Sequence, residues 1–406
     1  MRRVIVIGGG AAGMLAAIKS AQNGNDVILL EKNEKLGKKI YITGKGRCNI
    51  TNSVSVEDFI PNVVGNPKFV YSALHCFSPE NLVDFLTENG LKIKVERGKR
   101  VFPESDKASD VTKTLEKALM KNNVDIRLNT IVNKILTENG NILGVETDCG
   151  VINADAVIVC TGGVSYQATG STGDGYAFAK SVGHNIVKPI PSLVGLNLRG
   201  DFHKILQGLS LKNVKLTAKM GEKEVYSDFG EMLFTHFGIS GPIVLSCSAV
   251  INRLPQQEIK LFLDLKPALD DETLDNRIVT ELEINRIKTV EVAIRSLMPK
   301  NMVQPFLAYA QIKRDKKCSE ITKQERSRIV NSLKNLKLEY DGLRPINEAI
   351  VTAGGVNVKE INPKTMESKI VKGLYFAGEV LDVDAYTGGF NLQLAFSTGF
   401  VAGNNA

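Results

Sequence analysis

The residues with the clearest chemical potential stand near the start of the chain, in the glycine-rich run Gly8-Gly9-Gly10-Ala11-Ala12-Gly13. It follows the apolar residues 4–7 directly and precedes a stretch of small residues with helical character. Glycines at such a strand–helix turn let the backbone approach a pyrophosphate, and the helix N-terminus favours an anion through its unpaired N–H groups and positive dipole end. The pattern predicts a dinucleotide-binding turn.

A second candidate group follows the next predicted strand, residues 26–30, which ends at Glu31. An acidic side chain in this position accepts hydrogen bonds from ribose hydroxyls and disfavours a 2′-phosphate. The alternative readings are a solvated charge at the end of a strand and a glycine turn that serves the fold alone.

The last part of the chain carries another strand–turn–helix pattern. Residues 373–379 predict a short apolar strand that ends in Gly378-Glu379, and a terminal helix is expected to begin near Asn391. In flavoproteins with two dinucleotide-binding motifs, this element holds the ribityl chain and the flavin, and the helix N-terminus stabilises negative charge on the reduced ring. The alternative is an ordinary crossover at the end of a Rossmann sheet.

The intervening elements predict a mostly parallel α/β sheet that is interrupted by insertions. We expect helices over residues 79–89 and from an N-cap at Ser109 to about 122, then an antiparallel meander, then a buried strand ending at Thr161-Gly162-Gly163. The meander is expected to comprise residues 125–129, 131–138, 142–147 and 150–153. From Pro189 the chain alternates polar and apolar residues with no helical period until about Lys266, which indicates an inserted β domain.

Residues 267–336 have a helical texture, and no glycine occurs between Gly241 and Gly342. The pattern of strands and glycines returns after Leu343. We therefore expect three domains: a discontinuous dinucleotide-binding domain (1–189 and 344–406), an inserted β-barrel-like substrate domain (190–266 and 337–343), and a helical insert (267–336).

Composition narrows the class of protein. With 406 residues, 43% of them hydrophobic, the chain suits a folded protein of two or three domains, and no apolar run approaches the roughly 20 residues needed to cross a bilayer. Met1-Arg2-Arg3 leads straight into the first strand, so we expect no cleavable signal and a cytoplasmic protein. The six cysteines show no metal-binding spacing, so no metal site and reduced thiols are expected.

The net charge of +7 is diffuse, although much of the excess lies in residues 313–337, which hold nine basic and three acidic residues. A solvated helix face is the favoured interpretation, and an RNA-binding patch is the alternative.

Several strings together resemble the BaiN/YhiN-type family of NAD(P)/FAD-dependent oxidoreductases, the aminoacetone-oxidase-like flavoproteins. They are Gly8 to Gly13, Glu31-Lys32, the string TGKGRCNITN at 43–52, STGDG at 171–175, EMLFTHFGISGP at 231–242, and residues 378–393. The resemblance covers the whole chain. It implies a glutathione-reductase-like FAD domain, interrupted by a β-barrel-like domain that itself contains a small helical domain.

The resemblance also implies FAD contacts, which group by the part of the cofactor. They are Gly8, Gly10, Ala11, Ala12 and Gly13 for the pyrophosphate; Glu31, Lys32 and the backbone of Val132 for the adenosine; Thr161, Gly162 and Gly163 on the adenosine side; Gly46, Arg47, Cys48 and Asn49 beside the flavin; and Gly378, Glu379, Asn391, Leu392 and Gln393 at the ribityl and pyrimidine end.

Two side chains are candidates for catalysis. Arg47 can pair with a phosphate or an anionic substrate, with a surface salt bridge as the alternative, and His236 lies in a glycine-flanked loop where it can act as an acid or a substrate ligand. The alternative for His236 is a histidine that braces its loop. A redox role for Cys48 is a further hypothesis, and a packed small residue is the favoured reading.

We expect an FAD-dependent oxidoreductase that transfers hydride between flavin N5 and a small or medium organic substrate, without nucleic acid or membrane insertion. No second strand–GxGxxG–helix unit is visible, so NAD(P)H is expected to bind transiently at the flavin; another donor, or dioxygen as acceptor, is the alternative. The rival functions are a flavoprotein that acts on tRNA or another nucleic acid, and a flavin-binding redox module without turnover.

Overall fold

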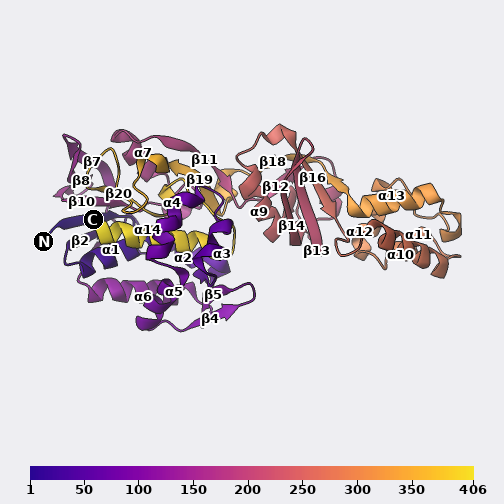
Figure 1. The fold of residues 1–406 in the computed structure, drawn as a ribbon, viewed down its shortest axis with the longest axis horizontal. Coiled ribbons are helices and arrows are strands. Elements are labelled where there is room, and N and C mark those ends of the chain that lie inside the picture. The colour runs from indigo at the N-terminus through magenta and orange to yellow at the C-terminus, as the bar shows by residue number, and fades with distance from the viewer. The chain divides into compact units, whose positions relative to one another are not determined.

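The computed structural model describes all residues 1–406 and divides into two compact units. Unit 1 contains Met1–Ser192 and Ile346–Ala406, and unit 2 contains Leu193–Pro345. Each unit has its own hydrophobic core. Figure 1 shows the chain leaving unit 1 once and returning to it for the last two strands and the last helix. The finer division into three domains stays a prediction.

Unit 1 is built on a five-stranded parallel sheet in the order β20-β10-β1-β2-β6. Its strands are β1 (Arg3–Ile7), β2 (Asp26–Leu30), β6 (Asp125–Arg127), β10 (Ala156–Val159) and β20 (Leu374–Phe376). The central strands are buried on both faces, as their continuous apolar runs require. The expected α/β fold with a Rossmann-type sheet is therefore confirmed.

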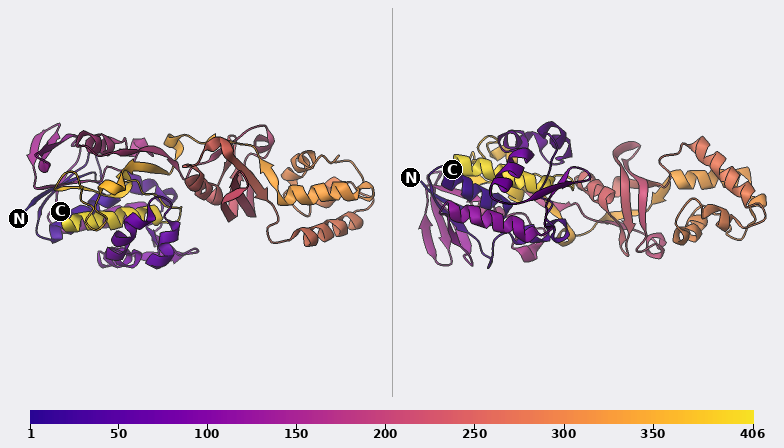
Figure 2. Two further views of the ribbon diagram at one scale, coloured as in Figure 1. Left: turned by 45° about the horizontal axis from the view of Figure 1, so that its top comes forward. Right: turned by 90° about the horizontal axis from the view of Figure 1, so that it is seen from below.

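Helices cover this sheet, and two of them set the geometry of the site. They are α1 (Ala11–Gln22) and α14 (Phe390–Asn405), which lie side by side in Figure 2. A Cβ added at Gly399 would lie 2.3 Å from the Ala12 carbonyl oxygen, and one added at Gly403 would lie 2.1 Å from that of Ala16. Glycine is thus required at both contacts, and the register shows that the two helices run in the same direction.

The remaining helices of unit 1 include the one expected at residues 79–89. They are α2 (Lys38–Ile42), α3 (Val56–Phe59), α4 (Pro67–Cys76), α5 (Pro79–Glu88), α6 (Ala108–Lys121) and α7 (Asp174–Ser181). The expected N-cap at Ser109 is wrong: α6 starts at Ala108 with Lys107 as the N-cap, and the Asp110 N–H donates to the Lys107 carbonyl (3.1 Å).

Three small antiparallel sheets complete unit 1: β3-β5-β4 (Thr51–Asn52, Arg100–Pro103, Ile93–Glu96), β7-β8-β9 (Val132–Glu138, Asn141–Thr147, Gly150–Asn153) and β11-β19 (Ile186–Ser192, Val351–Val356). The expected four-strand meander is corrected to three strands. Its first segment is β6, whose residues 125–127 pair in parallel with β2 because α6 returns the chain to the edge of the central sheet.

Unit 2 contains one seven-stranded antiparallel sheet and a group of helices. The sheet order is β17-β16-β13-β14-β15-β12-β18, formed by Leu336–Leu338, Ile259–Asp264, Ser210–Met220, Lys223–Phe234, Gly238–Ser240, Leu196–Leu198 and Tyr340–Leu343. The helices after β16 are α10 (Asp271–Ile284), α11 (Val290–Ile294), α12 (Lys300–Tyr309) and α13 (Lys323–Lys334).

The expectation that no helix precedes Lys266 is wrong. Unit 2 also contains α8 (Phe202–Ile205) and the longer α9 (Pro242–Ile251). The α9 sequence PIVLSCSAVI is apolar around most of its circumference and largely buried, so it lacks the amphipathic period that marks a surface helix. None of the helices in the chain has the length and apolar character needed to cross a bilayer.

The α1–α14 contact leads to a stability prediction. Gly399→Ala should lower the free energy of unfolding by about 1–3 kcal/mol, because the added methyl group meets the Ala12 carbonyl and forces the helices apart. Asn404→Ala, at an exposed position of the same helix, should change it by less than about 0.5 kcal/mol. Urea denaturation measures both, and equal effects of the two substitutions would contradict the role assigned to the contact.

Candidate functional site

The glycine-rich loop after β1 has the geometry of an anion cradle. Gly8 has φ +102°, and a Cβ on Gly13 would lie 1.9 Å from the Gly8 carbonyl oxygen, so neither position accepts a larger residue. A Cβ on Gly10 would meet nothing within 4 Å. Gly10 is also the N-cap of α1 and makes no side-chain cap, so no side chain satisfies the N–H groups of Ala11 and Ala12. The loop leaves open the face on which a phosphate binds.

Glu31 lies at the end of β2, beside this loop. Its carboxylate is buried and accepts hydrogen bonds from the Gly9 N–H (2.8 Å) and the Asn33 N–H (2.8 Å). Lys32 reaches across to Asp174 (2.6 Å). Val132 begins β7 two residues after Thr130, whose amide donates to the Glu31 carbonyl. The structure thus brings together Glu31, Lys32 and Val132, the three residues expected to contact the adenosine.

The loop after β10 continues the same edge of the sheet. A Cβ on Gly8 would lie 2.7 Å from the Cys160 carbonyl, which directly precedes Thr161-Gly162-Gly163. The Thr161 hydroxyl is buried and has no hydrogen-bond partner within the protein. Carboxyl ends of parallel strands meet here, at the point where the strand order reverses beside β1, which is where open α/β sheets bind ligands.

Glu379 is the charged centre of this edge. Its carboxylate pairs with Lys39 (2.6 Å) and accepts from the Ser165 hydroxyl (3.0 Å) and the Thr352 N–H (2.9 Å). Burial by itself raises the pKa of Glu379, but the Lys39 charge and these hydrogen bonds together hold it below its usual value. The preceding residue, Gly378, approaches Ala12 of α1, since its Cβ would lie 2.9 Å from the Ala12 Cβ.

Lys39, Ser165 and Thr352 were missed by the sequence analysis. Lys39 is 340 positions from its partner, so no local pattern joins them. Glu379 itself was the available signal, because a carboxylate in a buried Gly-Glu turn requires a cation nearby. The Lys38-Lys39 pair, which follows Gly37 in the same predicted domain, was a candidate for that cation.

A second helix N-terminus faces the segment that was expected beside the flavin. Gly389 is the N-cap of α14, with φ +101° and no side-chain cap. A Cβ on Gly389 would lie 2.4 Å from the Thr51 carbonyl, and the Asn52 amide donates to the Gly388 carbonyl (3.2 Å). Thr51 and Asn52, which directly follow the segment expected beside the flavin, therefore lie against the start of α14. The side-chain oxygens of Asn49 and Asn52 are buried there without a partner.

Of the α14 residues predicted to contact the cofactor, Asn391 and Gln393 already use their side chains within the protein. The Asn391 side chain bonds to the backbone of Ala385, and the Gln393 side chain is fully buried between Thr51 and Ser397. The Gln393 N–H already bonds to the Gly389 carbonyl. The groups of this turn that no side chain caps are the backbone N–H groups ahead of Gln393, including those of Asn391 and Leu392.

The parallel packing of α1 and α14 relates these two termini. With Gly399 opposite Ala12, the start of α14 lies about 12 Å before the start of α1 along their common direction, at a rise of about 1.5 Å per residue. Two uncapped N-termini at this offset suit one elongated ligand with an electron-rich group at each end.

Arg47 is fully engaged within unit 1. Its guanidinium contacts Glu96 (2.5 Å) and Asp106 (2.6 Å) and lies over the Phe102 ring, 4.2 Å from the centroid. These hydrogen bonds, that of Glu96 first, raise the pKa of Arg47, and the Arg47 bond in turn lowers the pKa of Glu96. The side chain braces the 43–49 loop against β4 and β5, while a catalytic role stays a prediction.

Cys48 directly follows Arg47 in the same loop. Its φ is +59° and its thiol is buried, which raises the pKa of Cys48 to about 12. A thiol of this kind stays protonated at neutral pH and is a weak nucleophile. The geometry therefore agrees with packing rather than with redox chemistry.

His236 belongs to unit 2, in the loop between β14 and β15. Its ring is exposed and packs edge-on against Phe237, with 5.1 Å between the centroids. The buried His203 ring lies close to the His236 backbone, while the His236 imidazole itself is accessible. The two catalytic candidates thus lie in different units.

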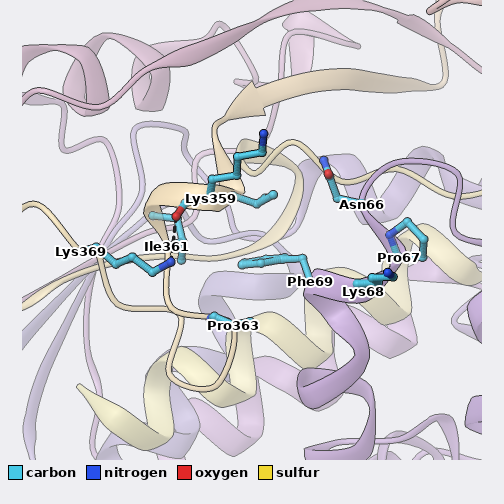
Figure 3. A pocket seen from close by; sticks show the side chains of 9 residues that line it. Asn66, Pro67, Lys68, Phe69, Lys359, Ile361, Pro363 and Lys369 are labelled. Carbon is cyan, nitrogen blue, oxygen red and sulfur yellow. Dashed lines mark hydrogen bonds between the residues drawn. The ribbon is translucent and has the colours of Figure 1, made fainter.

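A pocket of about 520 Å³ lies elsewhere in unit 1, between the start of α4 and residues 358–369 (Figure 3). Phe69 and Ile361 provide its apolar surface, and Lys369 turns its amine to the Lys359 carbonyl (2.8 Å). None of the predicted cofactor or catalytic residues lines this pocket.

Comparisons with known proteins agree with this geometry. The HI0933-like protein Rossmann domain family matches residues 2–405. The chain is 32% identical to a 3-dehydro-bile acid delta(4,6)-reductase of Clostridium scindens, covering 100% of this chain and 99% of that one. It is also 32% identical to a ribosomal RNA dihydrouridine synthase of Haemophilus influenzae, with 98% and 96% covered.

The fold is similar to that of a flavocytochrome c3 fumarate reductase, with a TM-score of 0.54 at 19% identity over 100% of this chain and 78% of the other. A family match over almost the whole length, together with a cradle that suits a dinucleotide, decides the assignment: the chain belongs to the HI0933-like family and is an FAD-dependent oxidoreductase.

Proposed function

We propose that the enzyme transfers hydride between flavin N5 and an organic substrate whose reacting bond is a C=C bond conjugated with a carbonyl group. The observation that carries this proposal is the chemistry in the names of the two full-length relatives. A 3-dehydro steroid unsaturated at positions 4 and 6 and a uracil ring both contain such a bond. Conjugation with the carbonyl group makes the β-carbon of the C=C bond electrophilic. Both substrates can therefore accept hydride at that carbon.

The residues of unit 1 fit FAD, which when bound supplies the hydride-transfer chemistry. The N–H groups of Ala11 and Ala12 would hold the pyrophosphate, and Glu31 the adenosine ribose. The N-terminus of α14 would stabilise negative charge at the pyrimidine end of the ring. The partnerless buried oxygens of Asn49 and Thr161 support the same assignment, because such atoms are uncommon unless a ligand or water satisfies them.

Lys39 and Glu379 would position the middle of the cofactor. The carboxylate is fixed by Lys39, Ser165 and Thr352, and it stays ionised because its pKa is lowered. A fixed carboxylate is a hydrogen-bond acceptor suited to hydroxyl groups of the ribityl chain.

NAD(P)H is the proposed reductant, bound transiently at the flavin. All parallel strands belong to the one five-stranded sheet of unit 1, so the fold provides no second Rossmann unit for a nicotinamide cofactor. Hydride addition to the β-carbon leaves negative charge that a proton must neutralise. His236, with its accessible imidazole, is the proposed proton donor.

A second candidate function is reduction of uracil within RNA. The Haemophilus influenzae relative, whose name states this activity, matches 98% of the chain at the same identity as the bile-acid enzyme. The two candidates share the reacting bond and differ in what carries it, either a free small molecule or a polynucleotide.

The first experiment is an absorption spectrum of the purified protein, followed by anaerobic titration with NADH and NADPH. We expect flavin bands that bleach, and then anaerobic recovery on addition of a 4-ene-3-ketosteroid or uracil-containing RNA. The matched controls are the saturated ketone and an isolated alkene, which should leave the flavin reduced. If the flavin recovers with dioxygen but with neither the steroid nor the RNA, the proposed reductase would be contradicted and an oxidase favoured.

The cradle gives a binding prediction. Gly10→Ala should raise the Kd for FAD about tenfold or more, equivalent to at least about 1.4 kcal/mol, because the methyl group enters the face left for the pyrophosphate. The melting temperature of the FAD-free protein should not change, since that Cβ meets no protein atom and the N-cap φ of −83° suits alanine. Isothermal titration with FAD measures the affinity, and wild-type affinity would exclude Gly10 from the pyrophosphate site.

His236→Gln tests the proton donor. Substrate-dependent reoxidation of the flavin should slow by about 10²-fold, the usual lower range for loss of a general acid, while reduction by NADPH is unchanged. His75→Gln, at another exposed histidine, is the control and should affect neither rate. Stopped-flow absorbance separates the two half-reactions. Equal slowing of both would indicate damage to flavin binding instead.

A further inference from the structure

Two loops of unit 2 join into one cationic surface. The loop after α10 and the loop after α12 are paired through the backbone: the Val290 N–H donates to the Lys316 carbonyl (2.8 Å), and the Cys318 N–H donates to the Lys288 carbonyl (2.9 Å). We call their five exposed basic residues the cationic patch: Arg286, Lys288, Lys313, Arg314 and Lys317.

Direct ion pairs do not neutralise the patch; Glu291 of α11 is an acidic neighbour of Arg314, but it pairs with Arg295 (2.9 Å). None of its five side chains takes part in an ion pair, whereas the neighbouring Lys316 pairs with Glu325 (2.7 Å) and Arg326 with Asp275 (2.7 Å). The acidic residues in the two loops are Asp315 and Glu320. Like charges gathered in this way destabilise the fold through repulsion, so the cluster is not explained by stability.

The same surface exposes two large apolar side chains. Ile284, at the end of α10, is 73% exposed, and Ile287, between Arg286 and Lys288, is 87% exposed. Exposed isoleucines framed by unpaired cations suit a partner that presents both negative charge and flat apolar faces.

We propose that the cationic patch binds the sugar–phosphate backbone of a folded RNA. This inference rests on the second candidate function and specifies how its substrate is held. Phosphates complement all five cations, two of which are arginines that bind phosphate with two hydrogen bonds and stack on bases. The isoleucines would pack against an exposed base or ribose.

An anionic membrane is the other polyanionic surface that the patch could meet, and it fits less well. A single myristoyl chain gives only marginal membrane binding, and two isoleucine side chains bury less apolar surface than that chain. The chain offers no amphipathic helix at this position, since Ile284 and Ile287 lie at a helix end and in a loop.

The test uses the FAD-loaded enzyme and a fluorescein-labelled RNA hairpin of about 40 nucleotides, followed by fluorescence anisotropy from 50 to 300 mM KCl. The patch variant replaces four cations with glutamine: Arg286, Lys288, Lys313 and Arg314. A control variant removes the same charge from exposed lysines of the β-sheet region of unit 2: Lys212, Lys215, Lys223 and Lys260. A separate Lys317→Glu variant guards against misfolding of the fourfold variant.

We expect the patch variant to lose at least about tenfold in RNA affinity at 100 mM KCl and to show a slope of log K against log salt reduced by about 2–3, because up to four phosphate contacts are removed. Lys317→Glu should weaken binding in the same direction, and the control variant should bind as the wild type does. Loss of binding in the control equal to that of the patch variant would overturn the proposal, since net charge alone would then explain it.

Retention on vesicles of 70% phosphatidylcholine and 30% phosphatidylglycerol without RNA binding would also overturn it. The proposed function is tested separately, because NADPH-dependent bleaching of the flavin and reduction of a free unsaturated ketone require no RNA. Patch-dependent RNA binding without uracil reduction would disprove the second candidate function while leaving the binding surface intact.

Discussion

The close parallel contact between α1 and α14 is the constraint on which the rest of unit 1 depends. Gly399 and Gly403 allow the backbone of the last helix to touch the Ala12 and Ala16 carbonyls of the first. A longer side chain at either glycine would separate the helices. Because both helices start without side-chain caps, this contact does more than fill the core: it fixes two positive helix ends at a set offset in one site.

The second constraint is the connection between distant parts of the chain. The Lys39–Glu379 pair joins α2 to the turn after β20, and the Asn52 amide joins β3 to the start of α14. Unit 2 is inserted between these partners in sequence, so the site is complete only after the last 61 residues, Ile346–Ala406, return to unit 1. Folding of the cofactor site thus requires contacts of high sequence separation, which are slow to form.

Sequence reasoning identified the parts of the fold that follow local rules. The glycine turn, the strand ending at Glu31 and the terminal helix all depend on short patterns with one physical meaning. It failed where a local pattern was absent or ambiguous. The buried helix α9 is apolar on most sides, so it has no helical period, and β6 was grouped with the meander because a three-residue strand does not reveal its partner. The contacts of Lys39 and Arg47 were also missed, because their partners are distant in the sequence.

The two candidate substrates raise the question of which unit selects between them. Reduction of a conjugated C=C bond requires the same electrophilic carbon and the same proton whether the bond belongs to a steroid or a uracil, so the chemistry does not discriminate. Every predicted FAD residue lies in unit 1, while His236 and the cationic patch belong to unit 2. A fold can keep its cofactor site and change its substrate through the part that carries recognition. Under the two proposals, substrate choice would rest mainly on unit 2, where the charge distribution distinguishes a polynucleotide from a small apolar ketone.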